Sequence, residues 1–118
     1  MLEIVSNDKN IILRDLVKED IDDFVRWNTT EIEWMNWDAP WEKEDEIDAI
    51  KEKDYWTNYY SNYKLKSNDR TRSRLEICIK NKEKTHIGWV NYYDIDQFFK
   101  YTKDDGYCTL GIGIPEQK

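Results

Sequence analysis

The sequence predicts an α+β domain in which two helices precede most of a largely antiparallel, four-stranded sheet. One strand-like segment comes first, two helical stretches follow, and three strand-like segments end the chain, so the element order is β-α-α-β-β-β. Helices that are segregated from strands in this way are typical of α+β architecture. Six Trp, eight Tyr and three Phe in 118 residues indicate a folded core, because disordered chains are poor in aromatic residues.

Hydrophobic spacing locates the first strand and both helices. Residues 11–16 follow a turn-like stretch and are rich in Ile and Leu, which favours a strand. Residues 18–27 carry apolar residues at helical spacing and acids in the first turn, which favours a short amphipathic helix. A longer helix is predicted from residue 42 to about residue 63, where no Gly or Pro interrupts the chain. Its expected buried face carries Ala49, Trp56, Tyr60 and Tyr63.

Three strands are predicted in the second half of the chain. Residues 74–80 alternate Leu75, Ile77 and Ile79 with polar residues and Cys78, which predicts a half-buried strand with these three on its apolar face. A polar turn of four residues leads to a strand over 85–94, so the two form an antiparallel hairpin. Residues 107–114 predict the last strand, which ends before Pro115. No repeat or linker divides the chain, so residues 1–118 form a single domain.

Charge and composition exclude several kinds of partner. The formal charge of -7 excludes duplex nucleic acid, whose binding depends on Lys and Arg at phosphates. It suits a cationic small molecule or a basic peptide end, although such an excess also serves solvation alone. No apolar run approaches the roughly 20 residues of a membrane span. No signal peptide is visible. Two separated cysteines and one His predict no metal site, and unpaired thiols predict a cytoplasmic protein.

A cluster of Trp and acidic residues follows the first predicted helix. Aromatic faces and carboxylates together attract a cationic amine through cation–π and Coulomb interactions. The alternative is that the Trp rings cover the core and the acids are solvated. The expected amine-binding wall consists of Glu31, Glu33, Trp34, Trp37, Asp38 and Trp41.

Three motifs in this order resemble the GNAT superfamily of N-acetyltransferases. The segment Ile12–Leu16 is similar to the "LRPL" entry strand, with Asp15 in place of the usual Pro. The segment Ile87–Val90 is similar to the family's "IG-x-V" strand, and Thr109–Pro115 to the strand that leads into the cofactor site. Within the superfamily, the chain resembles the branch that acetylates ribosomal-protein N-termini, polyamines and some antibiotics. The resemblance covers the N-terminal portion of such a domain.

The resemblance implies acetyl-CoA as cofactor. It implies that the pantetheine arm is bonded by the main chain of Leu110, Gly111, Ile112, Gly113 and Ile114, and that a backbone N–H near Ile112 polarises the thioester carbonyl. Two glycines in a strand are unfavourable by themselves, which fits a close backbone approach to a ligand. The alternative is a kinked edge strand packed under a helix.

The resemblance also directs attention to the end of the strand over 85–94. In GNAT folds, groups that line the acceptor often come from this region, so Tyr92 or Asp94 is the expected catalytic residue that orients the amine or removes its proton. A strand-end Asp also serves as an ordinary turn residue. His86 and Cys78 are expected to be structural, because neither has a neighbour in the sequence that would activate it.

We therefore expect an acetyl-CoA-dependent transferase that acts on a primary amine of a peptide N-terminus, a polyamine or an aminoglycoside-like acceptor. The sequence ends at Lys118, where the family's pyrophosphate loop would begin, so we expect a truncated domain that is inactive and binds no acetyl-CoA by itself. The alternative is a non-catalytic binding or assembly module. In either case the exposed last strand is expected to mediate homo-oligomer formation.

Overall fold

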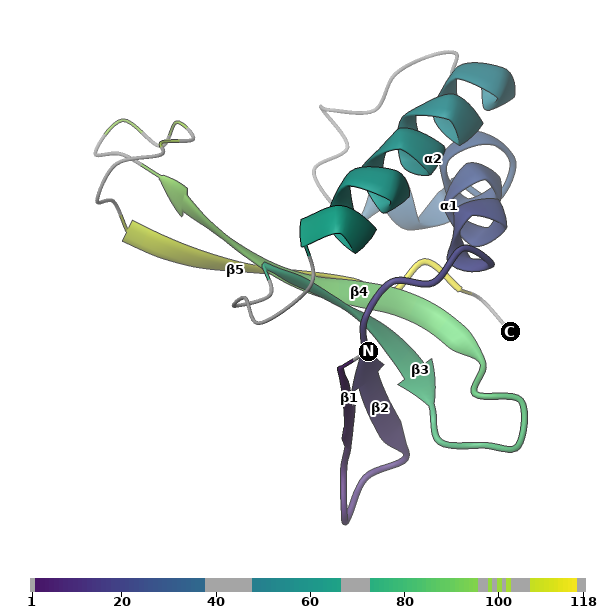
Figure 1. Ribbon diagram of the computed structural model, residues 1–118, viewed down its shortest axis with the longest axis vertical. Helices are drawn as coiled ribbons and strands as arrows, with labels where there is room; N and C mark the ends of the chain where they lie inside the picture. The colour runs from purple at the N-terminus through teal and green to yellow at the C-terminus, as the bar shows by residue number, and fades with distance from the viewer. Residues whose placement is uncertain are drawn as a thin grey trace.

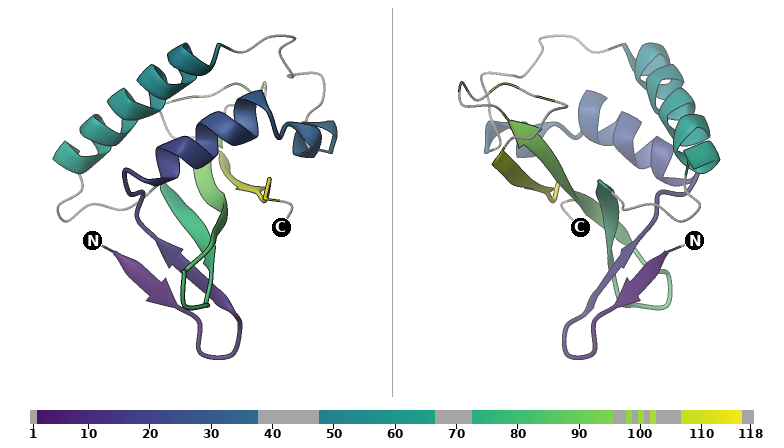
Figure 2. Two further views of the ribbon diagram at one scale, coloured as in Figure 1. Left: turned by 90° about the vertical axis from the view of Figure 1, so that its right-hand side faces the viewer. Right: turned by 60° about the vertical axis from the view of Figure 1, so that its left-hand side comes forward.

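The computed structural model describes residues 2–37, 48–66, 73–95 and 107–116, together with Phe98, Lys100 and Thr102. Of residues 63–66, 94, 95 and 107 only the main chain is described. Two helices lie together over one face of a twisted sheet, and a short 3-10 helix follows the first of them (Figures 1 and 2). The elements are β1 (Glu3–Val5), β2 (Ile11–Arg14), α1 (Asp20–Thr29), η1 (Glu33–Asn36), α2 (Ala49–Lys66), β3 (Arg74–Ile79), β4 (His86–Ile95) and β5 (Tyr107–Gly113).

The sheet contains five antiparallel strands in the order β1-β2-β3-β4-β5. The predicted α+β class, with two helices and an antiparallel sheet, is confirmed. The last strand lies at an edge, as expected. The predicted helix over 18–27 is displaced by two residues, and the predicted start of the second helix falls in 38–47, which lies outside the described residues.

The predicted number of strands was wrong, because β1 was assigned to no element. Three residues are too few to show the period of two by which a strand is identified in a sequence. Its pairing with β2 defines β1: Glu3 lies opposite Arg14, and Val5 opposite Ile12. Outside the ladder, the main-chain N–H of Leu2 donates to the Asp15 carboxylate over 2.7 Å. The strand β1 is therefore identified by its pairing with β2 and not by its local sequence.

The core lies between the helices and the sheet. From α1, Phe24 and Trp27 are buried, at 1% and 0% exposed. The helix carries three acids in its first turn and Arg26 in its last, which agrees with the direction of its dipole. From α2, Trp56, Tyr59 and Tyr60 pack against this core. Tyr59 was not among the predicted face residues, and Ala49 is exposed.

Burial on β3 is not confined to the predicted apolar face. Ile77 of that face is buried, at 4% exposed, but Glu76 and Cys78 of the other face are both 0% exposed and point toward α1 and α2. Burial of Glu76 is tolerated because Arg74 and His86 bind its carboxylate. The alternation was real, but the charged residue had buried partners that no local pattern shows.

Apolar residues of β1, β2, β3 and β5 lie on the helix-free face of the sheet. In register, Ile4 lies opposite Leu13, and Leu13 opposite Ile77. At the other edge of this face, Leu110 and Ile112 are 77% and 65% exposed. Within the described part of the chain, no helix has the length and apolar character of a membrane span.

Candidate functional site

A cavity of about 520 Å³ lies between η1 and the end of β5. It brings together the expected amine-binding wall and the expected cofactor strand, whose roles were predicted from separate patterns. The described lining residues are Glu33, Trp34, Trp37, Ile112, Gly113, Ile114 and Pro115. Segments almost 80 positions apart in the sequence thus form one site.

The two Trp residues of the cavity are held differently. The indole N–H of Trp34 donates to the Trp27 carbonyl over 2.7 Å, and its ring meets Trp89 edge to face at 5.5 Å. Trp34 is therefore a fixed wall. Trp37 is 88% exposed, so its ring face is open to a ligand. Trp34 thus packs on the core, which is the alternative considered for the Trp cluster, whereas Trp37 does not.

The main chain of β5 presents hydrogen-bonding groups at the open edge of the sheet. The N–H of Tyr92 donates to the Ser73 carbonyl at 2.9 Å, so Tyr92 directs its main chain toward β3. Because successive residues of an antiparallel ladder alternate in direction, Val90 also turns to β3. Their partners on β5, Leu110 and Ile112, therefore direct their N–H and C=O groups away from β4.

The strand glycines are explained by packing within the sheet. A Cβ at Gly113 would lie 2.5 Å from Cζ2 of Trp89, and one at Gly111 would lie 2.5 Å from Oδ1 of Asn91. The β4–β5 register runs without a bulge. The side chains of β4 therefore occupy the space over both glycines, on the face that carries the helices.

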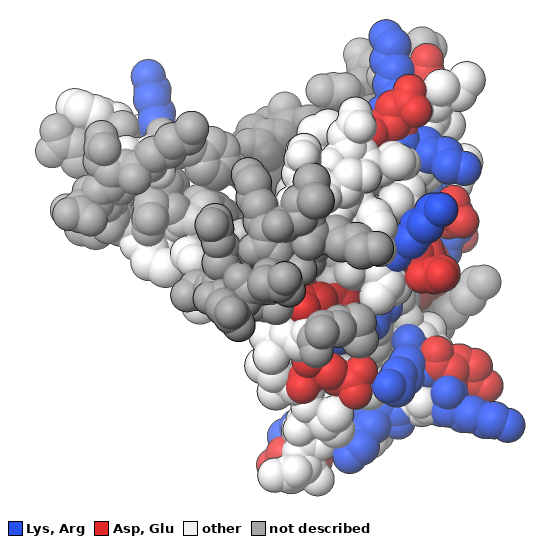
Figure 3. All heavy atoms as spheres, in the orientation of Figure 1, with Lys and Arg blue, Asp and Glu red and all other residues white. Residues whose placement is uncertain are grey.

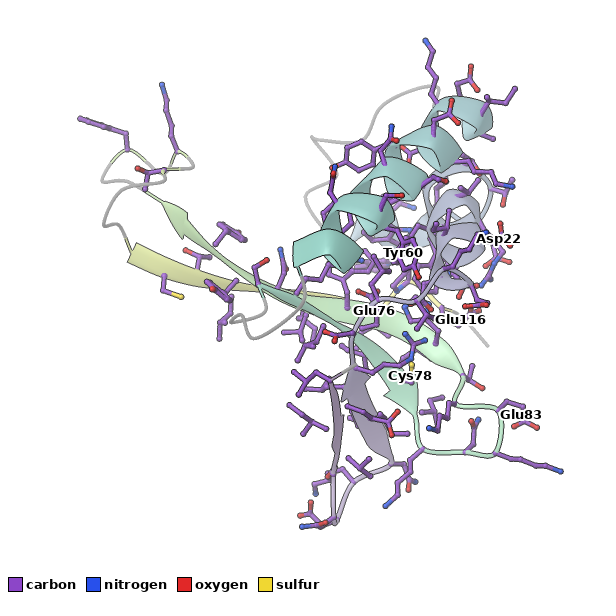
Figure 4. The ribbon with its side chains drawn as sticks, in the orientation of Figure 1. Asp22, Tyr60, Glu76, Cys78, Glu83 and Glu116 are labelled. Carbon is purple, nitrogen blue, oxygen red and sulfur yellow. The ribbon has the colours of Figure 1, made fainter. Side chains whose placement is uncertain are left out.

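Arg26 of α1 connects the cavity walls. Its guanidinium binds Glu31, which precedes η1, and binds Glu116 at 2.7 Å, just beyond the cavity-lining Pro115. Asp23 is a third partner, at 2.9 Å. The Glu116 carboxylate is 4% exposed and also accepts from the Trp27 indole N–H. Figure 4 shows Glu116 beneath α1, where this contact anchors the segment that follows β5.

A buried polar network lies behind the cavity. His86 Nδ1 is 2.8 Å from Asp23, and Nε2 is 3.0 Å from Glu76 (Figure 4 places Glu76 under the helices). Burial alone lowers the pKa of His86, but the bonds to Asp23 and Glu76 outweigh it and raise the pKa from 6.5 to about 9. The imidazole is thus a cation at neutral pH. Its described partners are the carboxylates of Asp20, Asp23 and Glu76.

Three donors of this network are close enough to hold a metal ion. The ligand atoms of Asp20, Glu76 and His86 lie within 4.8 Å of one another. However, Arg14 binds both oxygens of Asp20, and Arg74 binds both oxygens of Glu76. A protonated imidazole is not a ligand. The arrangement therefore fits an imidazolium held between carboxylates better than a metal ion.

The expected catalytic residues lie along the strand rather than in the cavity lining. Tyr92 is opposite Leu110, two residues from Ile112. Asp94 is opposite Cys108, five residues before Gly113, which is roughly 17 Å at about 3.4 Å per residue. Only the main chain of Asp94 is described. Asp38 and Trp41 of the predicted wall lie outside the described residues.

Sequence reasoning missed three residues that shape the site, namely Arg26, Trp89 and Glu116. Arg26 is an ordinary last-turn cation by sequence, and Glu116 is an ordinary acid near the end of the chain. The sequence did contain one indication of Trp89. A large side chain on one predicted strand and two glycines on the next suggest that the large side chain fills the space over a glycine, as Trp89 does over Gly113.

Two helices over an antiparallel sheet define an α+β domain, and its cavity lies beside the outward main chain at the end of an edge strand. The sequence model of the acetyltransferase (GNAT) domain family matches residues 10–117. The chain therefore belongs to the GNAT family, and its function is of acyltransferase type. No curated protein and no solved structure matches it.

Proposed function

We propose that this protein transfers an acetyl group from acetyl-CoA to a primary amine. GNAT domains in general use acetyl-CoA. The observation that carries the proposal is the cavity that joins the Trp and Glu wall to the main chain of β5. One wall suits a cationic amine, and the other offers main-chain groups to an extended ligand.

The residues present fit the pantetheine arm of the cofactor. Leu110 and Ile112 direct N–H and C=O groups to the open edge, where an amide-containing arm adds like a further strand. When bound, acetyl-CoA supplies a thioester whose C–S bond is exchanged for the C–N bond of the product amide. The outward N–H of Ile112 would be the donor that polarises the thioester carbonyl and stabilises negative charge on its oxygen.

The acceptor is held by the other wall. Glu33 attracts the ammonium group, and Trp34 and Trp37 bind it through their ring faces. Before attack the amine loses a proton. Tyr92, opposite Leu110, lies nearer the cavity than Asp94, so we assign it the relay of that proton, directly or through water. Catalysis then depends mainly on holding amine and thioester in contact.

A proline substitution in β5, made in the full-length protein, tests the proposal. Ile112→Pro removes an N–H that points away from β4, which an edge strand tolerates. We expect Ile112→Pro to lower kcat about 10²-fold, since loss of one oxyanion donor has that effect. The matched control Ile112→Val keeps the N–H and is expected to keep the rate. Mass spectrometry of the acetylated amine gives the readout. Equal rates for the two variants would refute the proposed role of β5.

A second candidate function is assembly of copies of the chain through β5. It is favoured by the edge position of the strand and by the exposed side chains of Leu110, Ile112 and Ile114. Unpaired main-chain groups at an edge are a template for pairing with another strand. The same groups are assigned to acetyl-CoA above, so assembly and cofactor binding compete.

We also place the protein in the cytoplasm. Cys78 is buried and Cys108 exposed, and neither forms a disulfide. An exposed thiol persists in a reducing compartment. Nonreducing electrophoresis of protein taken directly from cells tests this location, because disulfide-linked dimers through Cys108 would contradict it.

A further inference from the structure

We infer that Arg26 is a positioning residue for the transfer reaction, because its guanidinium joins the amine-binding wall to the segment that follows β5 and so sets the separation of the two substrates. The inference rests on the proposed function and assigns a role to a residue outside the described lining of the cavity. It follows from the last turn of α1, where two consecutive residues each contact both walls of the cavity.

Arg26 contacts the two walls with different nitrogens of its guanidinium. One terminal nitrogen donates to Glu31 of the predicted amine-binding wall, and the other donates to Glu116 at 2.7 Å, one residue beyond the cavity-lining Pro115. The second nitrogen also donates to Asp23, which is 2.9 Å away and lies one turn earlier on α1. Since the guanidinium is planar and presents its donors at fixed angles, it holds the two walls at a set separation.

Trp27 connects the same two walls. Its main-chain carbonyl accepts the indole N–H of Trp34 over 2.7 Å, and its own indole N–H donates to Glu116 over 3.4 Å. Trp27 is 0% exposed, and the Arg26 guanidinium lies 5.6 Å from the centroid of its ring. The last turn of α1 is therefore one support for η1 and for the segment that follows β5.

The ion pair between Arg26 and Glu116 differs from the surface pairs around it. Figure 3 shows Lys and Arg beside Asp and Glu over the side of the molecule that carries α1 and α2, and exposed pairs of this kind contribute little because water screens them. The Glu116 carboxylate is instead 4% exposed, and its pair with Arg26 spans 90 positions of the sequence. Without the guanidinium, this buried charge would move toward water and shift the neighbouring Pro115.

Such a shift should affect the reaction more than binding. In the proposed function the amine binds to Glu33 and to the rings of Trp34 and Trp37, whereas the pantetheine arm binds to the main chain of β5. Each substrate thus depends mainly on one wall. Attack of the amine on the thioester depends on both, and a misplacement of about 1 Å costs about 10²-fold in rate.

The first test is Arg26→Lys in the full-length protein. Lysine keeps the positive charge, but its single nitrogen cannot donate to both walls in the forked geometry. We expect kcat to fall at least about tenfold, while the Kd values for coenzyme A and for the amine stay within about twofold by calorimetry. The amine is the one that the parent acetylates fastest among an alanine-initiated peptide, spermidine and kanamycin.

Ile21→Val is the matched control for that variant. It shortens a buried residue of α1, which is 4% exposed, so it lowers stability while the guanidinium contacts remain. We expect it to keep the parent kcat. An unchanged kcat in Arg26→Lys, an equal loss in Ile21→Val, or a loss explained entirely by weaker binding would overturn the inference and leave the proposed function standing. If the parent acetylates none of the three amines, both fail.

A cycle of two Glu→Gln variants tests whether one residue joins the walls. Glu31→Gln weakens the contact with the amine-binding wall, and Glu116→Gln weakens the contact with the segment after β5. If Arg26 acts by holding the walls together, either change should lower kcat nearly as much as both changes do, because release at one end is sufficient. Losses that multiply in the double variant would show that the two acids act independently, and would contradict the inference.

Discussion

Trp89 of β4 lies directly over Gly113 of β5, so close that a Cβ on Gly113 would be 2.5 Å from the indole Cζ2 atom. The same indole meets Trp34 at 5.5 Å, and Gly113 and Trp34 both line the cavity. A missing side chain on one strand thus lets a large side chain on the next strand support the cavity wall.

We predict that Gly113→Ala destabilises the protein by about 1–3 kcal/mol, the usual cost of overpacking. Gly111→Ala is the matched comparison, because its Cβ would meet only the end of the Asn91 side chain, which can rotate away. Urea unfolding gives both free energies. In a double-mutant cycle, Trp89→Phe should reduce the cost of Gly113→Ala. If the free-energy changes of Trp89→Phe and Gly113→Ala are additive, contact with the indole is not the reason that position 113 requires glycine.

Stability should fall as the pH rises from about 6.5 to 9. His86 has a raised pKa of about 9 in the folded protein, so folding favours the protonated form. This contribution is fully present below the unfolded-state pKa of 6.5 and is lost as the pH passes the folded-state value. Its size is about 3 kcal/mol for a buried group with such a shift. Urea unfolding at pH 6 and pH 9.5 measures it.

His86→Gln is the control for that pH dependence. Glutamine keeps hydrogen-bonding capacity but does not titrate. We expect its free energy of unfolding to be lower at pH 6 and nearly constant up to pH 9.5. A variant that loses stability with pH as steeply as the parent would assign the effect to another group.

Removal of the Arg26 guanidinium should loosen the segment that follows β5. Glu116 is almost fully buried, and the bond to Glu116 is the largest contribution that raises the pKa of Arg26. We expect Arg26→Gln to cost about 1–3 kcal/mol, as for a charged hydrogen bond whose partner stays buried. Arg26→Lys keeps the charge but not the shared geometry, and should cost less. Thermal unfolding ranks the three proteins, and equal midpoints would contradict a structural role.

Self-association should depend on β5 and on the cofactor. We expect Leu110→Lys and Ile112→Lys to raise the dimer dissociation constant at least tenfold in sedimentation, because a Lys on an edge strand opposes strand pairing. Ile50→Lys, an exposed site on α2, should leave it unchanged. Coenzyme A should also favour the monomer, because the pantetheine arm and the β5 strand of a second copy would compete for the outward main-chain groups of Leu110 and Ile112. A monomer at all concentrations would refute assembly through β5.

The two thiols should differ in reactivity. Burial raises the pKa of Cys78, which is 0% exposed, whereas Cys108 is exposed on β5. Because the thiolate is the reactive form, a disulfide reagent should modify one thiol in the native protein and two in urea. Peptide mapping should place the native modification at Cys108. Rapid labelling of Cys78 without denaturant would show that the sheet opens beneath the helices.

The order of elements and the α+β class could be predicted from the sequence, because the spacing of apolar residues is a local property of the chain. The strand pattern of β4 and the amphipathic character of α1 are both visible within short stretches of the sequence. The burial of Glu76 on β3 could not be predicted in this way. Leu75, Ile77 and Ile79 alternate as a buried face would, and Ile77 is buried. Glu76 on the other face is buried as well, since Arg74 on its own strand and His86 on the next neutralise it.

The candidate site divides in the same way. The composition of the segment around Trp34 and Trp37 indicated an amine wall, and the glycines of β5 indicated an unusual strand. That η1 lies beside the end of β5, so that both line one cavity, was not contained in either pattern.

The sequence by itself determined the family and the class of fold, because three ordered motifs and the spacing of apolar residues are written along the chain. Only the tertiary structure decided which groups of β5 face outward, what fills the space over Gly113, and which acids Arg26 has already engaged. Each of these depends on contacts between residues far apart in the sequence, whose distances are set by strand register and helix packing rather than by local preference.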